Sequence, residues 1–236
     1  MRHCLALLAA FALPAMAHAD TVTVAATAVI YCPTDAGCAS NAGGTQPGAG
    51  ISTSGVQSFT FSVPLAGGSA QTLTLSGGGN YNDADGNHSG SDSSSETGNA
   101  LYGGIDAPGA GYLVGLFTGP DTTRGADTTY DTNAESALSF SPTLNQVFFI
   151  GDGLTGDGSG TTQTFFVPTG ATTLYLGISD AGGYHGGPTT GYQDNFGSFS
   201  VNVLPSTAAT PEPSSFVLLG TGVAGMMGMA RRRFLR

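Results

Sequence analysis

Two stretches of the chain decide its fold. Residues 172–180 read Thr-Thr-Leu-Tyr-Leu-Gly-Ile-Ser-Asp, and residues 194–204 read Asp-Asn-Phe-Gly-Ser-Phe-Ser-Val-Asn-Val-Leu. Both are rich in aromatic and β-branched residues, and the second alternates apolar with polar side chains, as a half-buried strand does. We therefore expect two β-strands, joined by a Gly-rich connection.

Further stretches of the same character lie upstream, separated by turns rich in Gly, Asp and Asn. Between the chain's two ends we find no amphipathic helix pattern, and roughly nine short strands predict an all-β fold, an antiparallel β-sandwich or jelly roll. A Gly-rich segment over residues 151–160 is expected to be a hairpin connection. The upstream strands are Thr21–Tyr31, Gln57–Val63, Gln71–Leu75, Tyr112–Thr118, Ser136–Phe140, Gln146–Ile150 and Gln163–Val167.

The body of the chain is acidic and almost free of basic residues. The sequence contains no lysine, and Arg124 is the only base between Asp20 and Thr210, against fifteen Asp and Glu residues. Nucleic-acid binding depends on Lys and Arg that neutralise phosphates, so we expect no nucleic-acid partner. We expect the carboxylates to keep the protein soluble outside the cell, and a second, compatible reading is that some of them hold a hard cation such as Ca²⁺.

The usual signatures of catalysis are missing from the sequence. Without lysine there is no Walker A lysine and no Schiff base, and no G-x-S-x-G elbow occurs. The numerous carboxylates leave a glycosidase-type Asp/Glu pair open, although no spacing singles one out. We therefore predict a protein that is not an enzyme, with a polysaccharide hydrolase as the least favoured reading.

Both extremities have the pattern of address signals. Residues 1–19 combine a short positive start, an apolar run over 4–16 and an A-x-A motif, which predicts a signal peptide cleaved between Ala19 and Asp20. The apolar run is shorter than the ~20 residues of a typical transmembrane helix. We expect the folded domain to cover residues 20–204, followed by a flexible linker over 205–210.

The C-terminal segment combines Pro211-Glu212-Pro213, an apolar Gly-containing run over residues 216–230, and four arginines among residues 231–236. With its flanking residues the run predicts a short transmembrane helix, and the positive-inside rule keeps the arginines in the cytoplasm. Residues 211–236 resemble the PEP-CTERM sorting signal of Gram-negative bacteria that make exopolysaccharide. The resemblance implies processing by the membrane enzyme exosortase, transient anchoring in the inner membrane, and release to the cell surface or extracellular matrix.

Two cysteines remain after the predicted signal peptide is removed. Cys32 and Cys38 flank a five-residue loop in a chain expected to reach an oxidising compartment. We expect a disulfide between them, because no further soft metal ligands lie nearby.

The candidate binding site lies where the two quoted strands meet. Asp180 ends the first strand, Asp194 and Asn195 open the second, and Ca²⁺ takes six to eight such oxygen ligands. This segment resembles the calcium-dependent galactophilic lectins of the PA-I type, whose pattern continues through residues 197–202. The resemblance implies a galactose-binding-like sandwich with Ca²⁺ held by Asp180, Asp194, Asn195 and the backbone carbonyls of Tyr81 and Thr190.

The same resemblance implies that the ion binds the hydroxyls of a galactoside or an exopolysaccharide, with Tyr184, His185 or Tyr192 packed on the sugar. Two departures from the family pattern affect this site: the loop after Asp180 is longer, and Asp194 replaces an Asn. A second Asp-rich loop, 82–88, either contributes to the site, binds another ion or is a solvated loop.

The sequence thus predicts an exported surface protein whose β-sandwich binds carbohydrate through Ca²⁺. Two alternatives stay open. One is a structural biofilm-matrix or adhesion protein without sugar binding, and the other is the hydrolase.

Overall fold

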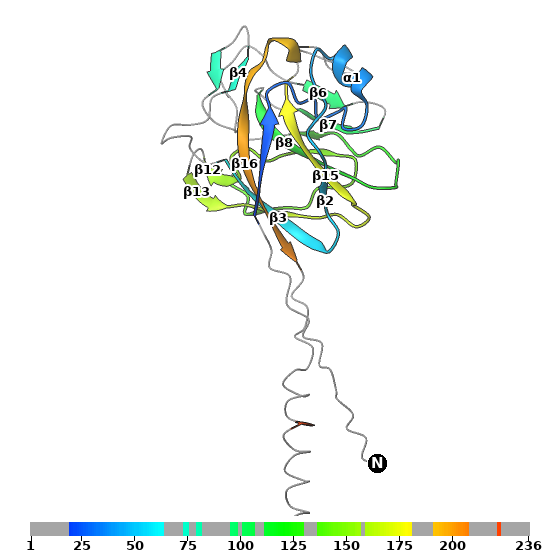
Figure 1. Cartoon of the computed structure of the whole chain (residues 1–236), viewed down its shortest axis with the longest axis vertical. Helices are drawn as coiled ribbons and strands as arrows, with labels where there is room; N and C mark the ends of the chain where they lie inside the picture. The colour runs from blue at the N-terminus through cyan, green and yellow to red at the C-terminus, as the bar shows by residue number, and fades with distance from the viewer. Residues whose placement is uncertain are drawn as a thin grey trace, which may run out of the picture. The chain divides into compact units, whose positions relative to one another are not determined.

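The computed structural model describes residues 19–63, 73–75, 79–81, 95–98, 101–106, 111–129, 136–156, 159–180, 191–207 and 221–222 (Figure 1). The chain divides into two compact units, Met1–Ser206 and Thr207–Arg236. The first unit contains the strands that carry the candidate site.

Two β-sheets form the body of the first unit. The larger sheet has the strand order β10-β14-β3-β16-β4-β5, and β1 also pairs with β16. Its strands are β1 (Asp20–Ala25), β3 (Val56–Ser62), β4 (Leu73–Leu75), β5 (Gly79–Tyr81), β10 (Ser139–Phe140), β14 (Thr164–Phe166) and β16 (Phe196–Thr207). The second sheet, in the order β11-β8-β15-β2, consists of β11 (Val147–Phe149), β8 (Tyr112–Thr118), β15 (Thr173–Ser179) and β2 (Ile51–Ser52).

The two sheets pack against each other through aromatic side chains. Phe59 of the larger sheet lies 6.2 Å from Phe117 of the second, measured between ring centroids, and Phe165 lies 5.8 Å from Phe148. All four rings belong to one buried cluster. Burial of apolar surface between facing sheets is the main stabilising contribution in such a fold.

Strand β8 is buried on both of its faces. Leu113 and Phe117 point into the cluster between the sheets, whereas Val114 and Leu116 belong to a second buried cluster with Ile105. A nearly continuous apolar run such as Tyr112–Phe117 is typical of a strand covered on both sides. The second sheet is therefore an inner layer of the domain.

Two smaller sheets complete the described residues. One contains β6 (Ser95–Gly98), β7 (Gly103–Asp106) and β9 (Thr128–Thr129); the other pairs β12 (Leu154–Gly156) with β13 (Ser159–Thr162). The segment 151–160 was expected to join its two flanking strands as a hairpin, and this expectation is wrong. Those strands, β11 and β14, belong to different sheets, and the segment carries most of a separate small hairpin between them.

The predicted all-β class is confirmed, with three corrections. The β10–β14 and β7–β9 pairs are parallel, so the sheets are not purely antiparallel. Between residues 19 and 207 the described part includes short helices, α1 (Ala36–Asn41) and the 3₁₀ turn η1 (Tyr192–Asp194), both too short to show an amphipathic period. Strand β16 continues to Thr207, because the sheet extends into the expected linker and Pro205 is tolerated near a strand end. The jelly-roll connection stays a prediction.

In the part of the chain that the structure describes, no helix is long and apolar enough to cross a membrane. The predicted transmembrane run 216–230 lies outside that part, apart from residues 221 and 222. The signal peptide likewise falls outside it up to residue 18, and its cleavage stays a prediction.

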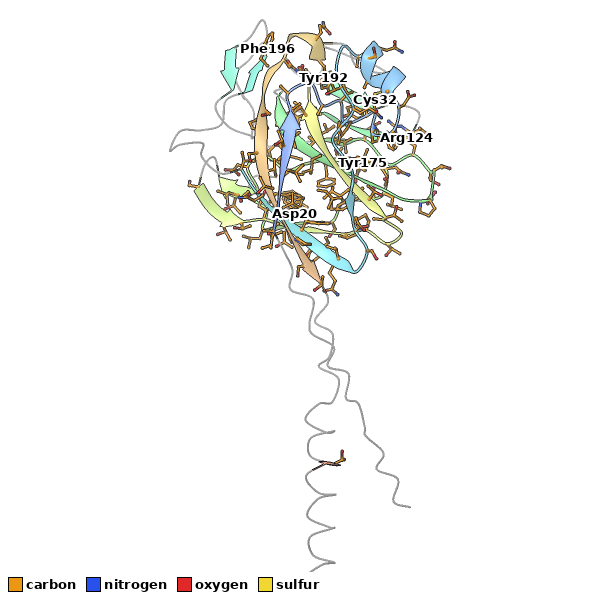
Figure 2. All side chains as sticks on the ribbon, in the orientation of Figure 1. Asp20, Cys32, Arg124, Tyr175, Tyr192 and Phe196 are labelled. Carbon is orange, nitrogen blue, oxygen red and sulfur yellow. A yellow bond between two sulfur atoms is a disulfide. The ribbon has the colours of Figure 1, made fainter. Side chains whose placement is uncertain are left out.

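Strand β1 begins at Asp20, the residue expected to follow signal cleavage, and pairs antiparallel with β16 from Asp20–Val203 to Ala25–Ser198. The first residue of the domain and the last residues of β16 are therefore at the same end of this strand pair. The start of β16, where the candidate site lies, is at the other end. Figure 2 shows Tyr192 and Phe196 towards one end of the domain and Asp20 nearer the other.

The predicted disulfide between Cys32 and Cys38 is present, with 5.6 Å between the two Cα atoms. The loop that it closes contains the start of helix α1. Asp35 caps this helix, because its carboxylate accepts hydrogen bonds from the backbone N–H groups of Gly37 and Cys38.

Removal of this disulfide is expected to lower the free energy of unfolding. In a Cys32→Ala/Cys38→Ala variant the loss of about 2 kcal/mol follows from the entropy of the short loop in the unfolded chain. Urea denaturation of the oxidised protein and the variant measures it. Identical denaturation midpoints would contradict the expectation.

Candidate functional site

Asp180 and Asn195 meet at the end of strand β15, as neighbours in space although 15 residues apart in sequence. The Asn195 Nδ2 donates a hydrogen bond of 2.6 Å to the Asp180 Oδ2 and another of 3.2 Å to the Ala26 carbonyl oxygen. Both side chains are buried, Asp180 being 8% and Asn195 4% exposed. The structure therefore brings together two of the predicted ligands, in a partly dehydrated setting where charge interactions are strong.

The Asn195 Oδ1 has no hydrogen-bond partner among the described residues, although it is buried. A buried amide oxygen without a donor costs about 1–3 kcal/mol, so its lone pairs favour a bound water or a cation. It belongs to the same amide group whose nitrogen contacts the Asp180 carboxylate. An oxygen of this kind beside a carboxylate is the donor type that Ca²⁺ prefers.

Tyr192 contacts the backbone of the site and does not face a bound ligand. Its hydroxyl donates to the Ile178 carbonyl oxygen at 2.9 Å and accepts from the Asp180 backbone N–H at 3.3 Å. The ring is fully buried in the core cluster. The expectation that Tyr192 packs on a sugar is therefore wrong. Its fully buried ring and hydroxyl bonds serve to join the two strand ends.

The other predicted ligands are described only in part. Tyr81 ends β5, and the pairing of Tyr81 with Leu73 and of Leu73 with Gly197 places its backbone two strands from the start of β16, about 10 Å away. Asp194 is the last residue of η1, directly before Asn195. Tyr184, His185 and Thr190, like the Asp-rich loop 82–88, lie outside the described residues, and their roles stay predictions.

Phe196 is a candidate that the sequence pattern did not reveal. It follows Asn195 directly and is 65% exposed, more than the other exposed phenylalanine, Phe166, at 47%. Asn195 is buried, whereas Phe196, the first residue of β16, is exposed. Because a Phe in an alternating strand is usually buried, only its exposure in the fold marks it.

The electrostatics away from the site leave no base free to hold an anion among the described residues. Arg124 is ion-paired with the carboxylate of Asp127 and also donates to the Gly125 carbonyl oxygen at 3.1 Å. In addition, the described residues contain no cluster of three or more His, Cys, Asp and Glu side chains that could hold a metal.

Comparison with known proteins identifies the tail. Residues 209–233 match the family model described as the PEP-CTERM protein-sorting motif. The chain carries a PEP-CTERM sorting tail. This motif implies an exported protein that exosortase processes and sorts to the cell surface of a Gram-negative bacterium, as the sequence predicted.

No curated protein and no solved structure matches the chain. The resemblance to the galactophilic lectins therefore gains no support from the comparisons. The motif Pro211-Glu212-Pro213 lies within the matched residues, outside those that the structure describes.

The described part of the chain also has a hollow of about 90 Å³ on another part of its surface. Leu101, Tyr102, Asp121 and Asn145 are among its lining residues. Burial raises the pKa of the Tyr102 phenol, and the neighbouring Tyr175 raises it further, against a lowering hydrogen bond from Thr34. Hydrogen bonds from Thr123 lower the pKa of the exposed Asp121 carboxyl.

The Tyr102 phenol is expected to ionise above the usual value for tyrosine. Because its pKa is higher in the folded than in the unfolded state, its contribution to stability is fully present below the unfolded pKa, near 10. That contribution is lost as the pH rises through the folded pKa. A spectrophotometric phenolate titration of the wild type and Tyr102→Phe checks this. If the phenol that is missing from the Tyr102→Phe titration ionises at or below pH 10 in the wild type, the expectation is contradicted.

Proposed function

We propose that this exported, exosortase-sorted protein binds Ca²⁺ at Asp180 and Asn195 and, through that ion, a neutral polysaccharide at the cell surface. The observation that carries the proposal is the buried Asn195 Oδ1 without a donor among the described residues, within an amide that contacts the buried Asp180 carboxylate. Because most buried polar atoms have a hydrogen-bond partner, an unsatisfied amide oxygen next to a buried carboxylate favours a bound cation or water.

The donor set fits a hard cation. Asp180 supplies a charged carboxylate and Asn195 a neutral amide oxygen, and both belong to the oxygen class that Ca²⁺ selects over nitrogen or sulfur. Asp194, Tyr81 and Thr190 are proposed to complete the ligand set. A bound Ca²⁺ supplies open coordination positions that attract sugar hydroxyls.

The protein's own charge favours a neutral polymer over an anionic one. The formal net charge is −10, and the one base within the domain is paired with Asp127. An anionic polysaccharide would meet repulsion from this surface, whereas a neutral one would not. The exposed ring of Phe196 offers an apolar surface beside the site, which suits the C–H face of a sugar ring.

The tail has a separate part in the proposal. The apolar run 216–230 is proposed to hold the protein transiently in the inner membrane until exosortase removes it. The pairing of Asp20 with Val203 puts the start of the domain beside the exit towards the tail, away from Asn195.

Ca²⁺ binding is tested with the isosteric change Asp180→Asn. The variant keeps an acceptor for the Asn195 amide but loses the charge, so the Kd for Ca²⁺ is expected to rise at least tenfold, by about 1.4 kcal/mol. Isothermal titration and the thermal shift with added Ca²⁺ measure the loss. Asp121→Asn, which removes a fully exposed carboxylate, is the control and keeps wild-type affinity. The absence of Ca²⁺ binding by the wild type would remove the proposal and favour a structural matrix protein.

Polysaccharide binding is tested with two exposed aromatics of the larger sheet. Phe196→Ala is expected to weaken Ca²⁺-dependent co-sedimentation with a neutral exopolysaccharide several-fold, because an exposed aromatic contact is worth about 1 kcal/mol. Phe166→Ala removes another exposed phenylalanine ring, on strand β14 instead of β16, and serves as the matched control. If the two variants co-sediment with the polysaccharide equally well, Phe196 does not contact the sugar.

A further inference from the structure

The chain segments before and after the Cys32–Cys38 loop are in direct contact with the candidate site. Helix α1 ends at Asn41 with Ala42 as its C-cap, and the N–H groups of the next two residues, Gly43 and Gly44, donate to the carbonyl oxygens of Ser40 and Ala39. A β-carbon on Gly44 would lie 2.9 Å from the Tyr192 Cβ and 2.5 Å from the Thr27 carbonyl oxygen. Only a glycine therefore lets this helix end approach the residue that holds the site.

Gly43 makes a second contact of the same kind. It has a φ of 78°, in the left-handed region that favours glycine, and a β-carbon there would meet the side chain of Gln193. Tyr192 and Gln193 belong to the η1 turn that leads into Asn195. The arm that continues from Cys38 thus packs against one wall of the site.

The arm that precedes Cys32 packs against the other wall. Val29 forms a bridge with Ile178, and the Ile178 N–H donates 2.9 Å to the Ala28 carbonyl oxygen, two residues before Asp180. The same arm supplies the Ala26 carbonyl oxygen to the Asn195 amide. Both arms of the disulfide therefore contact the site, one on each side.

Segment 26–45, which contains the Cys32–Cys38 disulfide, is called here the disulfide cradle. We propose that the cradle positions Tyr192 and so sets the ion affinity of the Asp180–Asn195 site. Tyr192 is the transmitting residue, because its hydroxyl accepts from the Asp180 N–H and its carbonyl accepts from the Asn195 N–H. The Cys32–Cys38 disulfide, which is present in the structure, holds the cradle in this position. This inference rests on the proposed function for the identity of the ion.

The test compares two glycines in the purified protein. Gly44→Ala places a methyl group against Tyr192, whereas Gly48→Ala, with no atom within 4 Å of its new β-carbon, is the matched control. With Ca²⁺ alone as the probe, Gly44→Ala is expected to raise the Kd at least tenfold and Gly48→Ala to leave it unchanged. Wild type reduced with a phosphine and Cys32→Ala/Cys38→Ala are expected to change in the same direction.

A second readout does not require the ion. Amide hydrogen exchange at Asp180 and Asn195 reports directly on the two hydrogen bonds to Tyr192, and it is expected to accelerate at least tenfold in the Gly44→Ala and disulfide-free proteins without Ca²⁺. In Gly44→Ala the amides of β8 are expected to keep their protection, and in the disulfide-free proteins they are expected to lose only the protection that the lower free energy of unfolding removes, which separates local repositioning from global unfolding. If Gly44→Ala does not fold, the reduced wild type gives the same comparison.

The outcomes separate the two proposals. A wild type that binds no Ca²⁺ removes the proposed function, and exchange at Asp180 and Asn195 then decides the cradle on its own. Unchanged exchange in Gly44→Ala and in the disulfide-free proteins would overturn the cradle, whatever the ion does. So would equal loss of protection in β8, because the effect would then be one of global stability.

Discussion

The arrangement at the end of the domain depends on one side-chain amide. Asn195 donates from a single nitrogen to the Ala26 carbonyl oxygen and to the Asp180 carboxylate, so it joins three chain segments that are far apart in sequence. Because the amide is buried, water does not compete for these bonds, and losing either partner would leave a polar group unsatisfied. These hydrogen bonds of Asn195 hold the two strand ends together, and with them the η1 turn and the candidate ligands.

The core explains why these segments can meet at all. Aromatic contacts such as Phe59–Phe117 fix the separation of the two sheets, and β8, covered on both faces, provides the rigid inner strand to which β15 is paired along its full length. Sites carried by the ends of packed strands are held more firmly than sites carried by free loops. Asp180 stands at such an end, directly after β15, with Tyr192 bonded across to Ile178.

Export and architecture agree in this protein. A disulfide beside a binding site persists in an oxidising compartment outside the cytoplasm, and the sorting motif implies that the chain is exported. The absence of lysine and the strong negative charge suit a surface protein beside neutral polymer. The proposed roles of the cradle, the ion and Phe196 are all roles for a protein outside the cytoplasm, at the cell surface.

The sequence by itself determined the elements whose signal is local. Alternation over 198–204 and the apolar run 112–118 predicted strands, cysteine spacing predicted the disulfide, and the Pro-Glu-Pro, apolar and arginine series predicted the sorting motif, because each depends on neighbouring residues alone. Tertiary structure decided which strands pair, that segment 151–160 joins different sheets, and that Tyr192 is buried while Phe196 is exposed. It also brought Ala26, Gly44 and Asn195 together. Such contacts depend on how distant segments pack, and no local pattern of residues encodes a separation of more than a hundred positions.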